Sequence, residues 1–233
     1  MTLTGAMDPI GAAAALTLTA SAFYRTTAGK REALTAGLWA AAFGLGVGAF
    51  VVPVDAALKD ATGLDSLSQL ITYIAMVISS YLIAQMTYRV ARIESYWPLV
   101  FTVTSMTGMV AFYCATDLHH VQTLAIEAVP GAASAWFAIF YAVGLLPTHI
   151  AAIIGVLGAR HKDNLMVWLL AIYGGVGALN PVLIVVDHIG THTVRWPLAF
   201  LYPFVWVIQL ISFGALSVTG AISTHRAKLL AVA

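Results

Sequence analysis

Charged side chains are scarce in this sequence of 233 residues, of which only 9% are Asp, Glu, Lys or Arg. A soluble domain carries about 25% charged residues, so this chain has too few to cover a surface that faces water. Hydrophobic residues make up 61% of the sequence, and its mean hydropathy is +0.90. The scarcity of charge therefore excludes an ordinary soluble protein and predicts one whose main partner is the lipid bilayer.

Cysteine and clustered basic residues are also scarce. Cys114 is the single cysteine, which excludes an internal disulfide bond and a CxxC metal or haem motif. The formal net charge is only +1 and no basic cluster is present, so nothing in the sequence favours a nucleic-acid partner. We expect neither a cofactor nor nucleic acid to bind.

Long apolar runs dominate the rest of the sequence. Backbone polar groups in a bilayer must be satisfied within the spanning element, and continuous rather than alternating runs favour helices over a barrel. About 20 residues are needed to cross the hydrocarbon core. We therefore predict an all-α polytopic membrane protein, a single seven-helix transmembrane bundle over residues 1–233, with helices at about 5–25, 33–54, 66–88, 97–117, 132–158, 165–187 and 196–222. The first run carries Asp8 and lacks a basic n-region, so we expect a membrane helix there and not a signal peptide.

Lysine and arginine predict the orientation. Lys59 and Arg195 fall on one side of the predicted bundle, and the other nine of the 11 positive residues fall on the opposite side. These nine are Arg25, Lys30, Arg31, Arg89, Arg92, Arg160, Lys162, Arg226 and Lys228. The positive-inside rule then places the N-terminus outside and the C-terminus in the cytoplasm. We expect a multi-pass protein of the cell membrane, with its longest loops, 55–65 and 119–131, outside; homo-oligomerisation stays open.

Acidic residues and histidines gather at the outer ends of the predicted fourth and sixth helices. Asp117 follows an apolar run, one helical turn beyond Tyr113 on the same face. Asp187 lies seven residues after Asn180, about 10 Å farther along the helix axis. Four histidines accompany these acids: His119, His120, His188 and His192. Since an ionisable group in the membrane is a functional candidate by default, we predict a polar funnel that opens at the outer face.

Simpler interpretations of these residues stay open. Carboxylates near helix ends reach interfacial water, and the histidines can be solvated loop residues. The Asp and His types suit zinc or copper, but their spacing matches no metal motif, so we assign no metal. His149 lies deep in the predicted fifth helix. The simpler interpretation is a hydrogen-bonded histidine of the core, and the functional alternative is a proton relay. Helix–helix hydrogen bonds explain Ser79 and Ser80 adequately.

Two families resemble the chain, whereas others do not. Microbial rhodopsins need a lysine in their last helix, and none occurs between Trp196 and Ser223, so the chain does not resemble that family.

The stretch from Ala56 to Ile71, AALKDATGLDSLSQLI, resembles the loop and third helix of an actinobacterial seven-helix family of putative transporters, which usually carry an added cytosolic domain. In size and helix number the chain is similar to the compact seven-helix integral-membrane terpene cyclases. Their fungal members place a Trp-Glu pair in the second helix, where this sequence has Ala42-Phe-Gly-Leu45.

The cyclase resemblance implies an intramembrane acid that protonates a prenylated lipophilic substrate. Such an acid is kept protonated by desolvation, in a dry cavity lined by aromatic faces that stabilise a cation. We expect Asp117 to be this acid and Asp187 to assist it or to act as the terminal base. The expected substrate-binding residues are Tyr113, Trp136, Tyr141, Tyr173, Asn180, Tyr202 and Trp206, supported by His119, His120, His149 and His188.

Two other functions stay open. One is a small-molecule permease whose path passes Asn180-Pro181 and His149, and the other is a sensor or assembly subunit without catalysis. A transporter with inverted repeats carries paired broken helices, and Asn180-Pro181 has no counterpart in the first three predicted helices. The sequence therefore favours the enzyme over the permease.

Overall fold

The computed structural model describes residues 3–27, 51–91, 93–122, 126, 129, 131–159, 164–194 and 202–232. These residues form helices and turns without a β-strand, which confirms the all-α class for the described part of the chain. Four described stretches are long and apolar enough to cross a membrane: Leu67–Arg89, Trp97–Ala115, Ala132–Leu157 and Leu165–Val186. Their length and composition indicate a membrane protein.

The helices follow the predicted apolar runs, with differences at their ends. They are α1 (Leu3–Thr27), α3 (Val51–Thr62), α4 (Leu67–Ala91), α5 (Trp97–Ala115), α6 (Ala132–Ala159), α7 (Asn164–Ala171), α8 (Leu179–Val194) and α9 (Tyr202–Val232). A 3₁₀ turn, η1 (Asp117–His120), follows α5, and a π-helical turn, η3 (Ile172–Val176), joins α7 to α8. Most of the predicted second helix, 33–54, lies outside the described residues.

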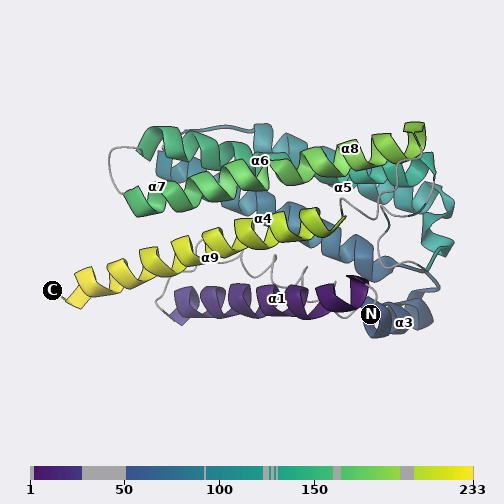
Figure 1. Ribbon diagram of the computed structural model, residues 1–233, viewed down its shortest axis with the longest axis horizontal. Helices are drawn as coiled ribbons and strands as arrows, with labels where there is room; N and C mark the ends of the chain where they lie inside the picture. The colour runs from purple at the N-terminus through teal and green to yellow at the C-terminus, as the bar shows by residue number, and fades with distance from the viewer. Residues whose placement is uncertain are drawn as a thin grey trace.

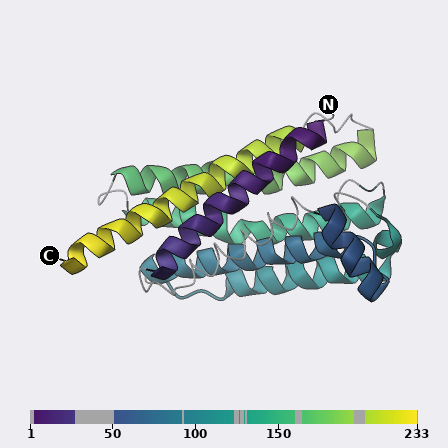
Figure 2. The same cartoon turned by 90° about the horizontal axis from the view of Figure 1, so that it is seen from below.

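Residues 55–65 correct the sequence prediction. The sequence predicts an external loop there, but most of this stretch is helical, because α3 continues through Thr62. Its polar residues form part of a short helix at the same end of the long axis as the N-terminal end of α1 (Figures 1 and 2). Asp55 on this helix is only 3% exposed, so it serves the packing of this end of the molecule.

The helices α4, α5 and α6 pack closely through small residues. A Cβ atom added to Gly108 on α5 would lie 2.3 Å from the Phe140 ring on α6. One added to Gly144 would lie 2.4 Å from Ser105 Oγ and 2.6 Å from Val77 on α4. Small residues allow such close approach between membrane helices, which compensates for the lack of a hydrophobic driving force in lipid. These contacts fix α6 against both of its neighbours and so fix the position of the site described below.

The first and last helices form a second packed unit. In both views α1 and α9 lie side by side, with their free ends at opposite ends of the long axis (Figures 1 and 2). The guanidinium of Arg25 is buried between them and donates to the carbonyl of Gly220 at 3.0 Å and to Thr224 Oγ1 at 3.1 Å. The Lys228 ammonium lies 4.3 Å above the Tyr24 ring, which adds a cation–π contact to the same pair of helices.

Candidate functional site

A proline in one helix and a wide turn in another interrupt the regular backbone hydrogen bonding near the centre of the bundle. Pro147 lies inside α6 and removes a backbone donor there. On the facing side, the helix that begins with α7 widens into the π-helical turn η3 before it continues as α8, and Figure 1 shows this run alongside α6. Wide turns of this kind are frequent at functional sites, because they leave backbone groups and side chains out of the regular register.

A small cavity lies between these interruptions. Its volume, taken as the space open to the centre of a water molecule, is about 10 Å³, which is room for about one water molecule. Helices α4, α6, α8 and α9 and the turn η3 supply its walls, where several polar groups lie in a mostly apolar surface. The lining residues are Met76, Ser79, Ser80, Leu145, Thr148, His149, Tyr173, Gly177, Asn180 and Ser212.

Hydroxyl groups tie the walls of the cavity together. Ser80 Oγ donates to the carbonyl of Leu145 at 3.3 Å and accepts from the Thr148 amide at 3.4 Å. The hydroxyls of Thr148 and Tyr173 are hydrogen-bonded to each other, and Ser212 Oγ donates to the carbonyl of Tyr173 at 3.1 Å. These bonds connect α4 to α6, α6 to η3, and η3 to α9.

Two buried polar atoms at the cavity have no hydrogen-bond partner among the described residues. They are Nδ1 of His149, which is 6% exposed, and Oδ1 of Asn180, which is 3% exposed. A buried polar atom left without a partner costs about 1–3 kcal/mol, so a bound species that satisfies both atoms would stabilise this arrangement. His149 and Asn180 were both expected site residues, and the structure brings them to one cavity.

The position of the His149 ring depends on a glycine. A Cβ atom added to Gly177 would lie 2.3 Å from Cε1 of His149 and 2.5 Å from Ser212 Oγ. The ring also lies beside Tyr173, with the two ring centroids 5.4 Å apart. Gly177 therefore lets the imidazole pack directly against the backbone of the facing helix, which is a specific structural use of this small residue.

Asp117 is not placed as the sequence predicts. Helix α5 ends at Ala115, Thr116 is extended, and Asp117 begins the separate turn η1, so it does not share a helical face with Tyr113. Its side chain is exposed among the described residues, and His120 in the same turn is exposed as well. The described residues therefore do not bury Asp117, and its role as the acid stays a prediction.

Tyr113 and His119 have structural partners instead. The Tyr113 hydroxyl donates to the backbone carbonyl of Asp65, and His119 Nδ1 lies 3.1 Å from the carbonyl oxygen of Tyr113. Lys59 and Asp65 form an ion pair of 2.7 Å in the same region. These contacts join the turn before α4 to the end of α5. The predicted funnel between the outer ends of the predicted fourth and sixth helices stays a prediction, because the side chain of Asp187 lies outside the described ones.

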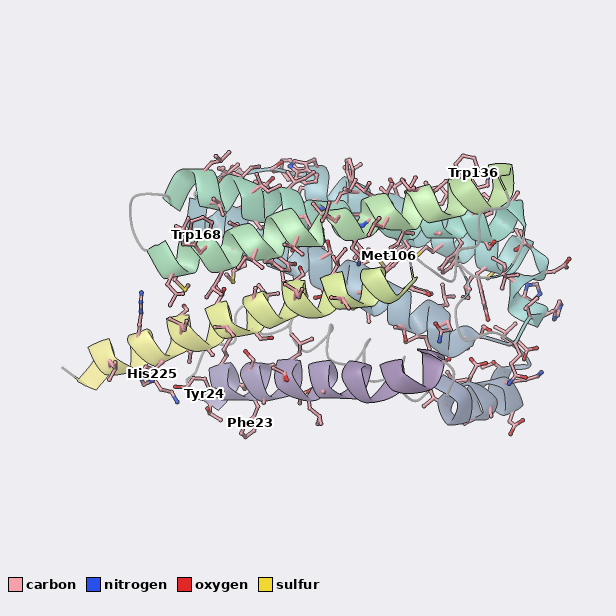
Figure 3. All side chains as sticks on the ribbon, viewed as in Figure 1. Phe23, Tyr24, Met106, Trp136, Trp168 and His225 are labelled. Carbon is pink, nitrogen blue, oxygen red and sulfur yellow. The ribbon has the colours of Figure 1, made fainter. Side chains whose placement is uncertain are left out.

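The aromatic residues of the predicted substrate site are dispersed. Tyr173 lines the cavity, whereas Tyr141 packs against Tyr73 with ring centroids 4.6 Å apart. Trp136 is 50% exposed and stacks on Phe112, near one end of the bundle (Figure 3). Of the described rings expected at one site, only Tyr173 lies at the cavity.

The remaining predicted site residues lie outside the described side chains. Asp187 and His188 belong to α8, which continues to Val194, so neither residue is at the helix end where the sequence predicts them. The backbones of Tyr202 and Trp206 belong to α9. Among the described residues, no group of three or more His, Cys, Asp or Glu side chains is placed to hold a metal ion. The zinc or copper alternative stays untested, because the side chains of Asp187, His188 and His192 lie outside these residues.

Part of the cavity lining was not predicted from the sequence. Ser80 and Ser212 were not expected at a site, since hydroxyls are common in membrane helices. Thr148 could have been found from its place between Pro147 and His149 in an otherwise apolar run. Comparisons with protein-family models, curated proteins and solved structures give no match for this chain. The geometry of the cavity must therefore carry the functional argument.

Proposed function

We propose that this chain is a membrane permease whose path for a small polar solute passes through the cavity between α4, α6, α8 and α9. The observation that carries the proposal is the convergence on one cavity of two buried atoms that have no hydrogen-bond partner in the described part of the chain, Nδ1 of His149 and Oδ1 of Asn180. Buried polar atoms without partners are rare in proteins, and each instance calls for an explanation such as a bound molecule.

The interrupted helices support the same proposal. Transporters commonly bind their substrates where membrane helices are broken, because freed backbone groups and polar side chains are available there. The sequence offers Asn180-Pro181 alone as a break, and the π-helical turn η3 extends this break by a further turn. In the facing helix α6, which is continuous, Pro147 leaves one backbone carbonyl without its helical donor. These two features move our preference from the enzyme to the permease.

The proposal includes seven crossings, with the N-terminus outside and the C-terminus in the cytoplasm. The nine-to-two distribution of positive residues supports this orientation through the positive-inside rule. An odd number of crossings also agrees with the free ends of α1 and α9, which lie at opposite ends of the long axis (Figure 2).

Thiol labelling tests the orientation. In a Cys114→Ser background, we expect Asp60→Cys to react with a membrane-impermeant maleimide in intact cells. Glu94→Cys should react only after the cells are opened. Both native side chains are exposed, and α4 separates them by its 25 residues, about 37 Å of helix. Labelling of Glu94→Cys alone in intact cells would show the opposite orientation.

Solute flux tests the permease itself. Proteoliposomes of the purified wild-type protein are mixed with hyperosmotic urea, glycerol, or the acetate salts of ammonium, sodium and potassium, and their reswelling is followed by stopped-flow light scattering. We expect at least one of these solutes to enter faster than it enters protein-free vesicles. Reswelling equal to that of protein-free vesicles for every solute would contradict the proposal.

Cyclisation of a prenylated lipophilic compound is the second candidate function. The buried rings of Tyr73, Phe137 and Tyr141 favour it, with centroid separations of 5.4 and 4.6 Å, because aromatic faces stabilise carbocations. The described cavity lining contains no carboxyl group, and Asp117 is exposed, so we rank this function second. Incubation of the same protein with farnesylated and geranylgeranylated aromatic compounds separates the two candidates, since only a cyclase converts them.

A further inference from the structure

No charged side chain lines the cavity in the described part of the chain, and most of the cavity surface is apolar. An ion that leaves water for such a place finds no counter-charge there, so the cost of its desolvation is high. The free volume of about 10 Å³ admits about one water molecule. The occupant that fits is therefore a neutral molecule with a single heavy atom.

The hydrogen-bonding groups at the cavity include both donors and acceptors. Asn180 Oδ1 can only accept and has no partner among the described residues, whereas the amide nitrogen of the same side chain can only donate. The hydroxyls of Thr148 and Tyr173 bond to each other, which uses one of their two hydrogens and leaves the other. His149 Nδ1 donates or accepts according to the tautomer of the ring. A molecule that both donates and accepts suits these groups, as water and ammonia do.

Gly177 brings two of the lining groups close to one point. A Cβ atom added to this residue would lie 2.5 Å from His149 Nδ1 and 2.5 Å from Ser212 Oγ. The nitrogen has no hydrogen-bond partner among the described residues, so it is not bonded to this hydroxyl. Two polar atoms that lie near one point without bonding to each other are within reach of a single bridging molecule.

The same geometry makes Gly177 the residue that sets the size of this space. Real Cβ atoms essentially never lie within 3.0 Å of such neighbours, so a methyl group at this position would displace the imidazole or the hydroxyl. Both groups line the cavity, and a displacement into a space for about one water molecule would close it. Gly175 in the adjacent turn η3 is different, because a Cβ atom added there meets nothing within 4 Å.

We infer that the cavity admits only a neutral molecule with one heavy atom, water or ammonia, and that Gly177 sets this limit. The inference deepens the proposed function and rests on its path through the cavity, since it names the chemical class of the solute and a residue that determines specificity. Ammonium outside a vesicle gives up a proton, ammonia crosses, and it takes up a proton from the water inside, which raises the internal pH. Urea and glycerol are larger and are excluded.

Stopped-flow measurements on proteoliposomes of the purified full-length protein test the inference. Ammonia entry is followed as the rise in internal pH of pyranine-loaded vesicles mixed with ammonium chloride, and water movement as shrinkage in hyperosmotic sucrose. We expect at least one of these rates to exceed that of protein-free vesicles, while urea and glycerol enter no faster than without protein. If neither rate is raised, the cavity holds at most a resident water molecule, and the inference is overturned.

Glycine variants locate the effect at the cavity. Gly177→Ala should lower the protein-dependent rate by about tenfold or more, because the added methyl group overpacks the space. Gly175→Ala is the matched control, since it makes the same change of residue without a steric contact and should keep the wild-type rate. Ser212→Val narrows the space from α9 and decides the matter if Gly177→Ala does not fold. A wild-type rate in whichever of the two blocking variants folds would overturn the inference.

The set of solutes distinguishes this inference from the proposed function. Faster entry of urea, glycerol, or sodium or potassium acetate than into protein-free vesicles upholds the permease and overturns the inference. A raised rate for water alone, with no faster entry of any dissolved solute, upholds the inference and removes the permease for dissolved solutes.

Discussion

Replacing Asp55 with alanine is expected to lower the free energy of unfolding by about 3–4 kcal/mol. The Asp55 carboxylate on α3 accepts from the Ser66 amide at 2.9 Å, from the Ser68 amide at 3.1 Å and from Ser68 Oγ at 2.8 Å. Hydrogen bonds to a charged group stabilise by about 1.5–3 kcal/mol each, and their loss would leave two amides at a buried helix end unpaired.

The position of this carboxylate explains the size of the expected effect. It lies at the N-terminus of α4, where free amides and the helix dipole favour a negative charge. It also holds Ser66 at a φ of 55°, in the left-handed region that costs free energy for a residue other than glycine. Asp55 therefore joins α3 to α4 and fixes the backbone between them.

Equilibrium unfolding in mixed micelles measures this change. Asp60→Ala is the matched control, because Asp60 is an exposed carboxylate on the same helix and its loss should stay within about 0.5 kcal/mol of wild type. Asp55→Asn keeps one acceptor oxygen, so its free energy of unfolding should lie between those of Asp55→Ala and Asp60→Ala. Equal stability of Asp55→Ala and Asp60→Ala would contradict a capping role for Asp55.

Solute flux through the Asn180→Leu variant is expected to fall by about 10–100-fold at solute concentrations below saturation. Leucine keeps the branched shape of the side chain but removes the amide oxygen, which has no partner among the described residues. A solute hydrogen left without this acceptor costs about 1–3 kcal/mol, which corresponds to about this change in affinity. Initial rates of flux into proteoliposomes of matched protein content measure the effect.

A control variant separates a loss of function from a loss of folding. Thr102→Val also removes a buried polar atom, but away from the cavity, and should keep the wild-type rate of flux. The elution volume in gel filtration and the helical signal in circular dichroism report on the fold of both variants. A wild-type rate in well-folded Asn180→Leu would exclude the cavity from the solute path.

The sequence predicts the fold class well because the relevant physics is local. A long apolar run with few charges can satisfy its backbone in lipid only as a helix, so α4, α5 and α6 appear close to their predicted bounds. The same argument does not apply to residues 55–65, where α3 is too short and too polar to register as a membrane helix. This helix is held in place by hydrogen bonds that Asp55 accepts from the amides of Ser66 and Ser68. These residues lie 11 and 13 positions farther along the chain, beyond the reach of a local pattern.

The candidate site was predicted only in part, for a related reason. Asn180 and His149 stand out because buried polar groups in apolar helices are costly, whatever their neighbours. Asp117 was expected to continue the face of Tyr113, but the extended backbone at Thr116 ends that helix first. The π-helical turn η3 breaks the regular helical period, and its effect on which side chains meet cannot be read from a spacing rule.

The contact between Arg25 and α9 has a consequence for biosynthesis. Arg25 and its acceptor Gly220 are 195 residues apart in the chain. At about 5–20 residues per second, a ribosome needs about 10–40 s after it has made α1 to produce the segment of α9 that receives the guanidinium. During that interval the α9 acceptors of Arg25 have not yet been made. The α1–α9 unit is therefore completed only when the last helix docks.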